Sequence, residues 1–461
     1  MGYDSAAMIE SAHTSGGGEH TPPTPGPEPA SAAVDGRAIA GTFDTPSGRR
    51  PQDWSAPLAA ASAGDRDVAR IVHAVEEGQR ISAEDALVLH ERADLTTLGR
   101  LADLVRQRKH PSGVVTYIID RNVNPTNVCL TDCGFCAFYR SPGDVDSYVL
   151  SRDEIYGKVA ELDRLGGRQV LMQGGHHPRL LSEWWGELIS DLRSRFPRVN
   201  AHALSAPELD HFSHFEKRPI EDVLRDLVDA GLGSVPGAGA EMLVERVRKI
   251  IAPKKTTTDR WLEVHRRVHE AGLRSSATMM FGHVETAAER VEHLQRVRDL
   301  QDETGGFTAF ISWTCQPDGT PEEHLYPEKA TPAVYLRVQA LSRIFLDNVE
   351  SIQTSYVTQG MKMGQMSLRY GANDFGGTMI EENVVSAAGC FHLESVQRVE
   401  HLIERAGFTP RQRNSWYGIV DERADAPARP ADRLEAATHA AAGEDCAVRA
   451  AGAGAATGAG A

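Results

Sequence analysis

Three cysteines, Cys129, Cys133 and Cys136, lie within eight residues in a C-x3-C-x2-C arrangement. They are half of the six cysteines in the chain and follow an apolar segment, residues 114–119, that reads as a strand. A structural zinc site needs a fourth Cys or His nearby, and an ordinary iron–sulfur centre takes four cysteines. Three thiolates in one loop therefore predict a four-iron cluster whose remaining iron is open to a non-protein ligand.

An open iron of this kind can bind the amino and carboxylate groups of S-adenosylmethionine (SAM). Electron transfer into the sulfonium then releases a 5′-deoxyadenosyl radical, which abstracts hydrogen from unactivated carbon. Such chemistry requires a site that excludes water and holds the substrate close. Phe135, which precedes the third cysteine, is an apolar residue suited to pack beside the cluster and the adenine.

Composition limits the other possibilities. The chain has 461 residues and a formal net charge of −15, which argues against binding to nucleic acid or to an anionic membrane. No run of about 20 apolar residues predicts a membrane span, and the acidic N-terminus lacks the order of a secretory signal. We therefore expect a cytoplasmic protein with reduced thiols, in which clustered cysteines bind metal.

The pattern divides the chain into four parts. Residues 1–62 are rich in Gly, Pro, Ser, Ala and Thr and are predicted to be a disordered extension. Residues 63–110 show apolar spacing typical of two or three short helices, and residues 111–420 form the main domain. Residues 421–461 are a low-complexity Ala- and Gly-rich tail, whose Cys446 is not expected to be a ligand.

Short apolar segments alternate with amphipathic stretches throughout the main domain. Steady alternation predicts βαβ units and a parallel sheet, and seven or eight repeats favour a closed (β/α)8 barrel over an open sheet. In such barrels chemistry collects at the carboxyl ends of the strands, and the cysteine loop follows the first strand. The candidate strands are 114–120, 169–173, 199–205, 234–237, 274–281, 307–313, 351–357 and, less regularly, 372–380.

Glycine, polar and titratable residues recur just past these strands. Paired glycines give a ligand access to bare backbone, although a tight turn would equally explain them, and each polar residue alone could be a helix cap. Their recurrence at almost every strand end favours a site. The candidates are Gln173, Gly174, Gly175, His176, His177, Ser205, Glu241, His283 and Glu285.

The chain resembles the radical SAM superfamily, whose hallmark is this cysteine loop after the first barrel strand. The resemblance covers roughly residues 66–420 and extends to the segments GGRQVLMQGGHHP, TMMFGHVET, QDETGGFTAFISWT and GANDFGGTMIEENV. These are similar to a branch that acts on nucleoside-like and aromatic substrates. Within it, Gly175-His176-His177-Pro178 and Phe281-Gly282-His283 most resemble the cyclic dehypoxanthinyl futalosine synthase (dehypoxanthine futalosine cyclase) family.

This resemblance implies a [4Fe–4S] cluster on the three cysteines and SAM as cofactor. It implies cyclisation of dehypoxanthine futalosine on the futalosine route to menaquinone, with an external electron donor such as flavodoxin or ferredoxin. Gln173, Gly174 and Gly175 would face the methionine moiety of SAM, and Ser205 and Glu241 are further candidate cofactor contacts. A base must take the final proton, and the sequence does not choose among His176, His177, His283 and Glu285.

Two positions depart from the family pattern, Pro125 and Cys315, and both could alter the substrate wall. Two alternatives remain open. The first is aminofutalosine synthase or a deazaflavin (FO) synthase subunit of the same superfamily. The second is a non-enzymatic zinc-binding module that uses the three cysteines and a histidine, and Cys315 could likewise serve as a fourth ligand.

Overall fold

Ten parallel strands form one sheet in the computed structural model, which describes residues 58, 64–326, 328–392 and 394–420. The predicted extension (apart from Leu58) and the Ala- and Gly-rich tail with Cys446 lie outside the described residues. The sheet order is β10-β1-β9-β8-β7-β6-β5-β4-β3-β2. The strands are β1 (Val114–Ile118), β2 (Asp120–Val123), β3 (Gln169–Met172), β4 (Asn200–Ala203), β5 (Ser234–Val235), β6 (Arg274–Phe281), β7 (Phe307–Thr314), β8 (Ser351–Gln353), β9 (Asp374–Gly377) and β10 (Thr409–Gln412).

The first barrel strand is split into two halves, and this split closes the sheet. β1 pairs with β9 whereas β2 pairs with β3, and only Ile119 separates the two halves. Past β9, Thr378 N–H donates to the carbonyl of Ile118, and Ile380 N–H donates to that of Asp120. Counted as one strand, β1 and β2 complete an eight-stranded ring, and β10 adds to the outer edge of β1. The predicted (β/α)8 barrel is confirmed.

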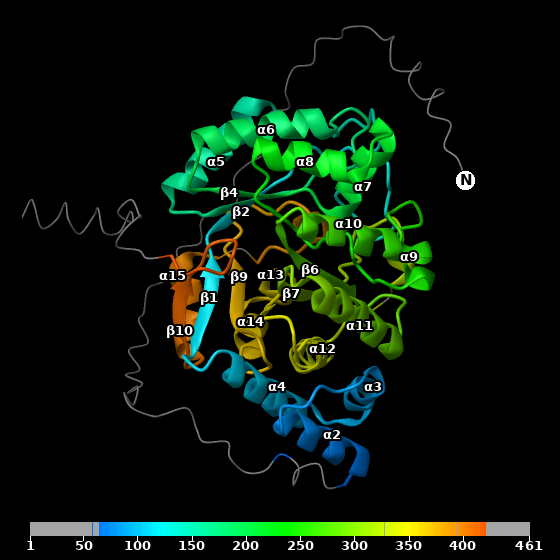
Figure 1. The fold of residues 1–461 in the computed structure, drawn as a ribbon, viewed down its shortest axis with the longest axis vertical. Helices are drawn as coiled ribbons and strands as arrows, with labels where there is room; N and C mark the ends of the chain where they lie inside the picture. Colours follow the sequence, from blue (N-terminus) through cyan, green and yellow to red (C-terminus); the bar gives the residue numbers. More distant parts are fainter. Residues whose placement is uncertain (1–57, 59–63, 327, 393, 421–461) are drawn as a thin grey trace, which may run out of the picture. The chain divides into compact units, whose positions relative to one another are not determined.

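Helices follow most strands, and their starts carry the signals read from sequence. Ser151 with Glu154 and Thr286 with Glu289 form capping boxes at the starts of α5 and α11. Figure 1 shows α5, α6 and α8 on one side of the strands and α10, α11 and α12 on another. These helices are α5 (Arg152–Arg164), α6 (Ser182–Arg195), α7 (Ala206–Glu216), α8 (Ile220–Ala230), α9 (Glu245–Ile251), α10 (Thr258–Glu270), α11 (Ala287–Thr304), α12 (Pro332–Phe345), α13 (Tyr356–Gln359), α14 (Met361–Ser367) and α15 (Val396–Arg405).

Among residues 64–110, the helices that precede the barrel are α2 (Arg66–Glu76), α3 (Ala83–Arg92) and α4 (Leu95–Lys109). They pack on the outer helices rather than on the sheet, since α4 lies against α12 and α3 against α11 (Figure 1). Arg337 joins the two layers by donating to the carbonyls of His90 and Ala93. No helix among the described residues is long and apolar enough to cross a membrane.

Candidate active site

All three cysteines line one cavity of about 340 Å³ at the carboxyl ends of the strands. The other walls come from segments far apart in sequence, namely the loops after β2, β3, β4, β5, β8 and β9. β6 and β7 contribute their own side chains. Among the sequence candidates, those that line this cavity are Phe135, Gln173, Gly174, Gly175, His176, Ser205 and Glu241.

Backbone contacts from three directions hold the cysteine loop. Leu130 N–H donates to the carbonyl of His176, Gly134 N–H donates to that of Ile251, and Glu322 N–H donates to that of Gly134. These partners belong to the loops after β3 and β7 and to α9, so the barrel itself fixes the positions of the thiols.

The donor set fits an iron–sulfur cluster. The described cysteines are free thiols, and Thr131 N–H donates to Cys129 Sγ at 3.4 Å. Burial raises the pKa of the Cys136 thiol, so the free thiol stays protonated. It would ionise on binding a metal. Within the described residues no group of three His, Cys, Asp or Glu side chains is placed to hold one metal ion. A cluster would need no such group, because each cysteine would bind a different iron.

Gly174 and Gly175, which follow β3, act through their backbone atoms and the absence of a side chain. A Cβ on Gly175 would lie 2.1 Å from the carbonyl oxygen of Val128 and 2.8 Å from Cys129 Cβ. Gly175 therefore allows the loop after β3 to pack directly on the backbone that carries the first cysteine. Gly174 has ordinary space, and its N–H donates to Glu208 Oε1 at 2.9 Å.

Substituting Gly175 by alanine is expected to cost about 1–3 kcal/mol of unfolding free energy and to lower the iron bound per chain, because backbone atoms must move. Gly157 is the matched control: it lies in α5 with nothing within 4 Å of a Cβ. Gly157→Ala is expected to stabilise the protein by about 0.5–1 kcal/mol. Urea unfolding and iron analysis measure both effects, and equal iron content in the two variants would contradict this role for Gly175.

A buried carboxylate joins the loops after β3 and β4. Glu208 Oε2 accepts from Ser205 N–H and Oγ at 2.8 and 2.7 Å, while Oε1 accepts from Gly174. Ser205 therefore lines the cavity while its hydroxyl donates to Glu208. The hydroxyl oxygen can still accept a hydrogen bond from a ligand.

Glu241 carries the clearest open polar atom of the cavity. Its Oε1 accepts from Lys255 Nζ at 2.7 Å, whereas the buried Oε2 has no hydrogen-bond partner among the described residues. Its φ of 38° is a strained value for a residue with a side chain. Burial alone would lower the pKa of Lys255, but the charges of Glu241 and Cys133 raise it above its ordinary value.

Arg248 supports the Glu241–Lys255 pair by binding the backbone on either side of it. The guanidinium is buried and donates to the carbonyls of Gly239 and Ala240 on one side and of Thr256 on the other. One side chain thus fixes the turns that carry Glu241 and Lys255. A fixed carboxylate with a free oxygen, beside an ammonium, suits the polar ends of a cofactor such as SAM.

His176 is the one candidate base that reaches the cavity. Thr131 Oγ1 lies 2.7 Å from its Nδ1, and no partner is recorded for Nε2 within the described chain. Burial holds the pKa of His176 well below its usual value, so the ring is neutral at pH 7.

The structure places the other three candidate bases outside the cavity. His177 Nδ1 accepts from the N–H groups of Arg179 and Leu180, so this ring caps its own loop. The adjacent histidines therefore do different work. His283 has both ring nitrogens occupied, since Nε2 donates to the Met280 carbonyl and Nδ1 lies 2.8 Å from Val284 N and 2.9 Å from Glu285 Oε2.

Glu285 is likewise engaged in holding its loop. It accepts from Gly282 N–H at 2.8 Å and pairs with Arg290 at 2.6 Å. Although burial opposes ionisation, His283 and Arg290 hold the pKa of Glu285 far below its usual range. Both oxygens of this carboxylate accept from the backbone of its own loop, so its role is to shape the turn after β6.

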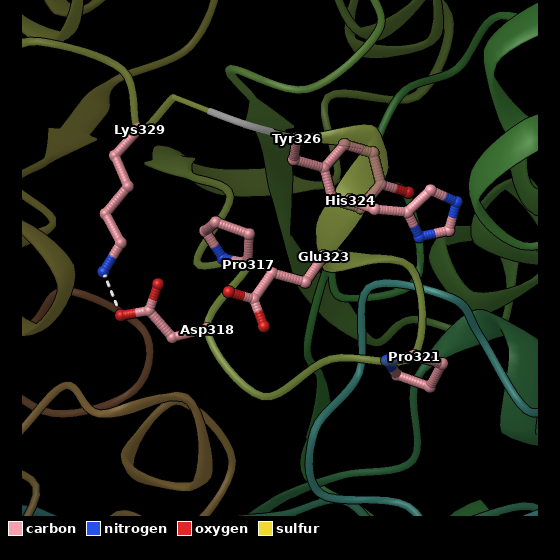
Figure 2. A pocket seen from close by; sticks show the side chains of 7 residues that line it. All are labelled: Pro317, Asp318, Pro321, Glu323, His324, Tyr326 and Lys329. Carbon is pink, nitrogen blue, oxygen red and sulfur yellow. Dashed lines mark hydrogen bonds and ion pairs between the residues drawn. The ribbon is translucent and has the colours of Figure 1, made fainter.

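A second cavity, of about 630 Å³, lies under the loop that follows β7 (Figure 2). Figure 2 shows Lys329 and Asp318 facing each other there, with Nζ and Oδ2 2.6 Å apart. The ring of Tyr326, which lines it, lies 6.4 Å from that of His283. Neither the cysteines nor the Glu241–Lys255 pair lines this cavity, so we place the active site in the cavity that the cysteines line.

Sequence reasoning missed four residues that build the active site. Glu208 had a usable signal, the Ser-x-x-Glu capping pattern that begins at Ser205. Lys255, Arg248 and Trp313 had none: the first two lie in a charged stretch, and Trp313 looks like an ordinary strand residue.

Family comparisons agree with this geometry. The Radical SAM superfamily matches residues 123–297, and the CofH/MqnC C-terminal region matches residues 304–425. Cyclic dehypoxanthine futalosine synthase of Halalkalibacterium halodurans is 43% identical over 351 residues, covering 76% of this chain and 94% of that protein. The chain belongs to the radical SAM superfamily. Members of this superfamily use a [4Fe–4S] cluster and SAM, and the chain is a radical SAM enzyme.

Other radical SAM proteins define the breadth of the likeness. The Streptomyces coelicolor cyclic dehypoxanthine futalosine synthase is 45% identical over 355 residues, covering 76% of this chain and 88% of that protein. Aminodeoxyfutalosine synthase of Thermus thermophilus is 40% identical over 371 residues, covering 79% and 97%. The maturase HydG from Carboxydothermus hydrogenoformans shares the fold, with a TM-score of 0.62, 16% identity and coverage of 78% and 83%.

Proposed function

We propose that this enzyme cyclises dehypoxanthine futalosine to cyclic dehypoxanthinyl futalosine on the futalosine route to menaquinone. The observation that carries the proposal is the 43–45% identity to two proteins named for this reaction, over most of the length of each. Aminodeoxyfutalosine synthase is the second candidate, supported by 40% identity over a similar length.

When bound, the cluster and SAM would supply a 5′-deoxyadenosyl radical able to take hydrogen from C4′ of the substrate ribose. Cys129, Cys133 and Cys136 would hold the cluster at one end of the cavity. Glu241 would accept a hydrogen bond from the cofactor through its free Oε2, and Lys255 would hold the carboxylate in place through Oε1. The enclosing loops exclude water, which protects a radical from side reactions.

After ring closure an electron and a proton must leave: the electron would pass to a one-electron acceptor such as the oxidised cluster, and His176 would take the proton. It is the one candidate base on the cavity wall, and its neutral ring leaves Nε2 open. Its contact with Thr131 orients that nitrogen, which is the requirement for a positioned general base. An external one-electron donor such as flavodoxin or ferredoxin would serve the cluster, and we place this chemistry in the cytoplasm, where thiols stay reduced.

Substituting His176 by glutamine is expected to lower cyclised product by about 10²–10⁴-fold, the usual contribution of a general base. Formation of 5′-deoxyadenosine should fall much less, because hydrogen abstraction precedes proton loss. His177→Gln is the matched control, since its ring lies outside the cavity. Equal losses of both products in His176→Gln, together with lost iron, would instead assign His176 to holding the cysteine loop.

The function itself is tested with anaerobically reconstituted enzyme, dithionite, SAM and dehypoxanthine futalosine. Mass spectrometry should detect the cyclised product together with 5′-deoxyadenosine. Failure to cyclise this substrate, with conversion of the aminodeoxyfutalosine synthase substrate instead, would favour the second candidate. A colourless protein with one zinc per chain would remove both.

A further inference from the structure

Trp313 lies on the face of β7 that points into the barrel, where it lines the active-site cavity. Burial alternates along β7, so that Ile311 and Trp313 are only partly covered whereas Ser312 and Thr314 are buried. Successive residues of a strand point to opposite faces. Ile311 and Trp313 both line the cavity, so this face is the interior of the barrel.

Strand register fixes what lies below the indole. Ile311 pairs with Thr278 of β6 and with Gln353 of β8, and all three line the cavity as one layer. Trp313 stands two residues farther toward the carboxyl end, between this layer and the loops that carry the cofactor site. A ligand resting on the layer would therefore meet the side of the indole.

The protein leaves this indole unused. Within the described residues, Trp313 has neither a hydrogen-bond acceptor for its N–H nor an aromatic or cationic partner for its ring. Trp184, Trp185 and Trp261, by contrast, all pack against other rings. Trp313 is partly exposed on the cavity wall, so its ring face and its N–H are both available to a ligand.

The remaining aromatic side chains of the cavity are already committed. Phe135, Phe138 and Tyr139 belong to the cysteine loop, at the cofactor end. Tyr356 is 1% exposed, packs against Phe375 with ring centroids 5.3 Å apart, and donates its hydroxyl to the Gly377 carbonyl. Trp313 is therefore the free aromatic surface on the strand wall.

We propose that Trp313 is a specificity-determining residue that binds the aromatic ring of the substrate by stacking. This inference rests on the proposed function, whose substrate joins a ribose to a benzoate ring. Holding the ring against the indole would keep its unsaturated carbons within reach of the ribose radical. The indole N–H would add a donor for an acceptor on the ring or its side chain.

The test compares Trp313→Leu and Trp313→Phe in the cluster-loaded enzyme. The ligands are dehypoxanthine futalosine and an analogue with cyclohexane in place of the benzoate ring. Trp313→Leu should weaken binding of the substrate roughly tenfold, and Trp313→Phe only about threefold, because phenylalanine retains a π-face. Calorimetry gives the affinities. The ratio of 5′-deoxyadenosine to cyclised product, measured alongside, should rise in Trp313→Leu because the ring is no longer held for attack.

The analogue separates stacking from simple space filling. Wild-type enzyme should bind the cyclohexane analogue more weakly than the substrate, whereas Trp313→Leu should bind the two equally, which is the logic of a double-mutant cycle. Equal losses for both ligands in Trp313→Leu, or an unchanged affinity for the substrate, would overturn the proposal. The exposed Trp416 lies outside the cavity, so Trp416→Leu should leave both affinities unchanged.

The two proposals fail in different ways. Wild-type enzyme that does not cyclise dehypoxanthine futalosine contradicts the proposed function. Wild-type enzyme that cyclises it, with Trp313 variants of unaltered affinity and product ratio, contradicts this inference alone. Iron content and thermal unfolding identify a variant that has merely misfolded, and in that case the Trp313→Phe arm still decides.

Discussion

Cys133→Ala is expected to bind almost no iron and to form no 5′-deoxyadenosine. The Cys133 thiol is buried, and the loop around it is fixed from three sides, so no other side chain can move into its place. A cluster ligand has no substitute in alanine, and activity should fall to the background of the assay. Iron analysis, the visible spectrum and chromatography of the nucleosides measure this result.

Cys315→Ala is the matched control, because Cys315 is equally buried but lies outside the active-site cavity. It should retain about four irons per chain and most of the activity. Loss of iron in Cys315→Ala would make this thiol a fourth ligand and remove the open iron. One zinc per chain in wild-type enzyme, lost in Cys133→Ala, would support the zinc-binding alternative.

The second large effect concerns stability. Arg413→Leu is expected to cost about 3–5 kcal/mol of unfolding free energy, because it strands a buried carboxylate. Arg413 pairs with Asp374 at 2.5 Å, and their side chains are 5% and 0% exposed. The carboxylate also accepts from Thr116 Oγ1 and Gly376 N–H. This pair therefore ties the segment after β10 to β9 and β1 inside the barrel.

Adding Asp374→Asn to Arg413→Leu should recover part of this loss, since the amide can still accept from its neighbours without carrying a charge. Arg80→Leu is the surface control. Arg80 pairs with Asp302 where both side chains are more than 40% exposed, so solvent screening should hold its effect below about 1 kcal/mol. Urea unfolding compares the three variants, and a loss in Arg413→Leu no larger than in Arg80→Leu would contradict a structural role for the buried pair.

Local patterns were enough to predict the barrel, and they also pointed to the three cysteines as a ligand set. The alternation of strands and helices is visible as short apolar segments that alternate with amphipathic stretches. Three thiols in eight positions are rare enough to indicate a ligand set. The strand β10 was not predicted, because an edge strand need not carry the apolar pattern of a buried one. Its sequence, Thr-Pro-Arg-Gln, is mostly exposed and shows no apolar alternation.

The polar part of the site was harder to read because roles there depend on where each side chain points. His176 and His177 are adjacent, yet one reaches the cavity and the other caps its own loop. The Glu241–Lys255 pair spans fourteen residues and an intervening helix. No short-range rule joins such positions. Trp313 had the pattern of a core strand residue, and only the strand register shows that its face of β7 lines the cavity.

The split first strand has a consequence for the order in which this enzyme can mature. The cysteine loop leaves the ribosome early, whereas the segments that complete the barrel, residues 374–381 and 409–413, come more than 200 positions later. Pairings between such distant parts form slowly and only after the intervening chain is made. Until then the wall around the thiols is incomplete, and the cysteine loop lacks the contacts that fix it in the folded barrel. We therefore expect the enclosed site to form only after the whole chain has been made.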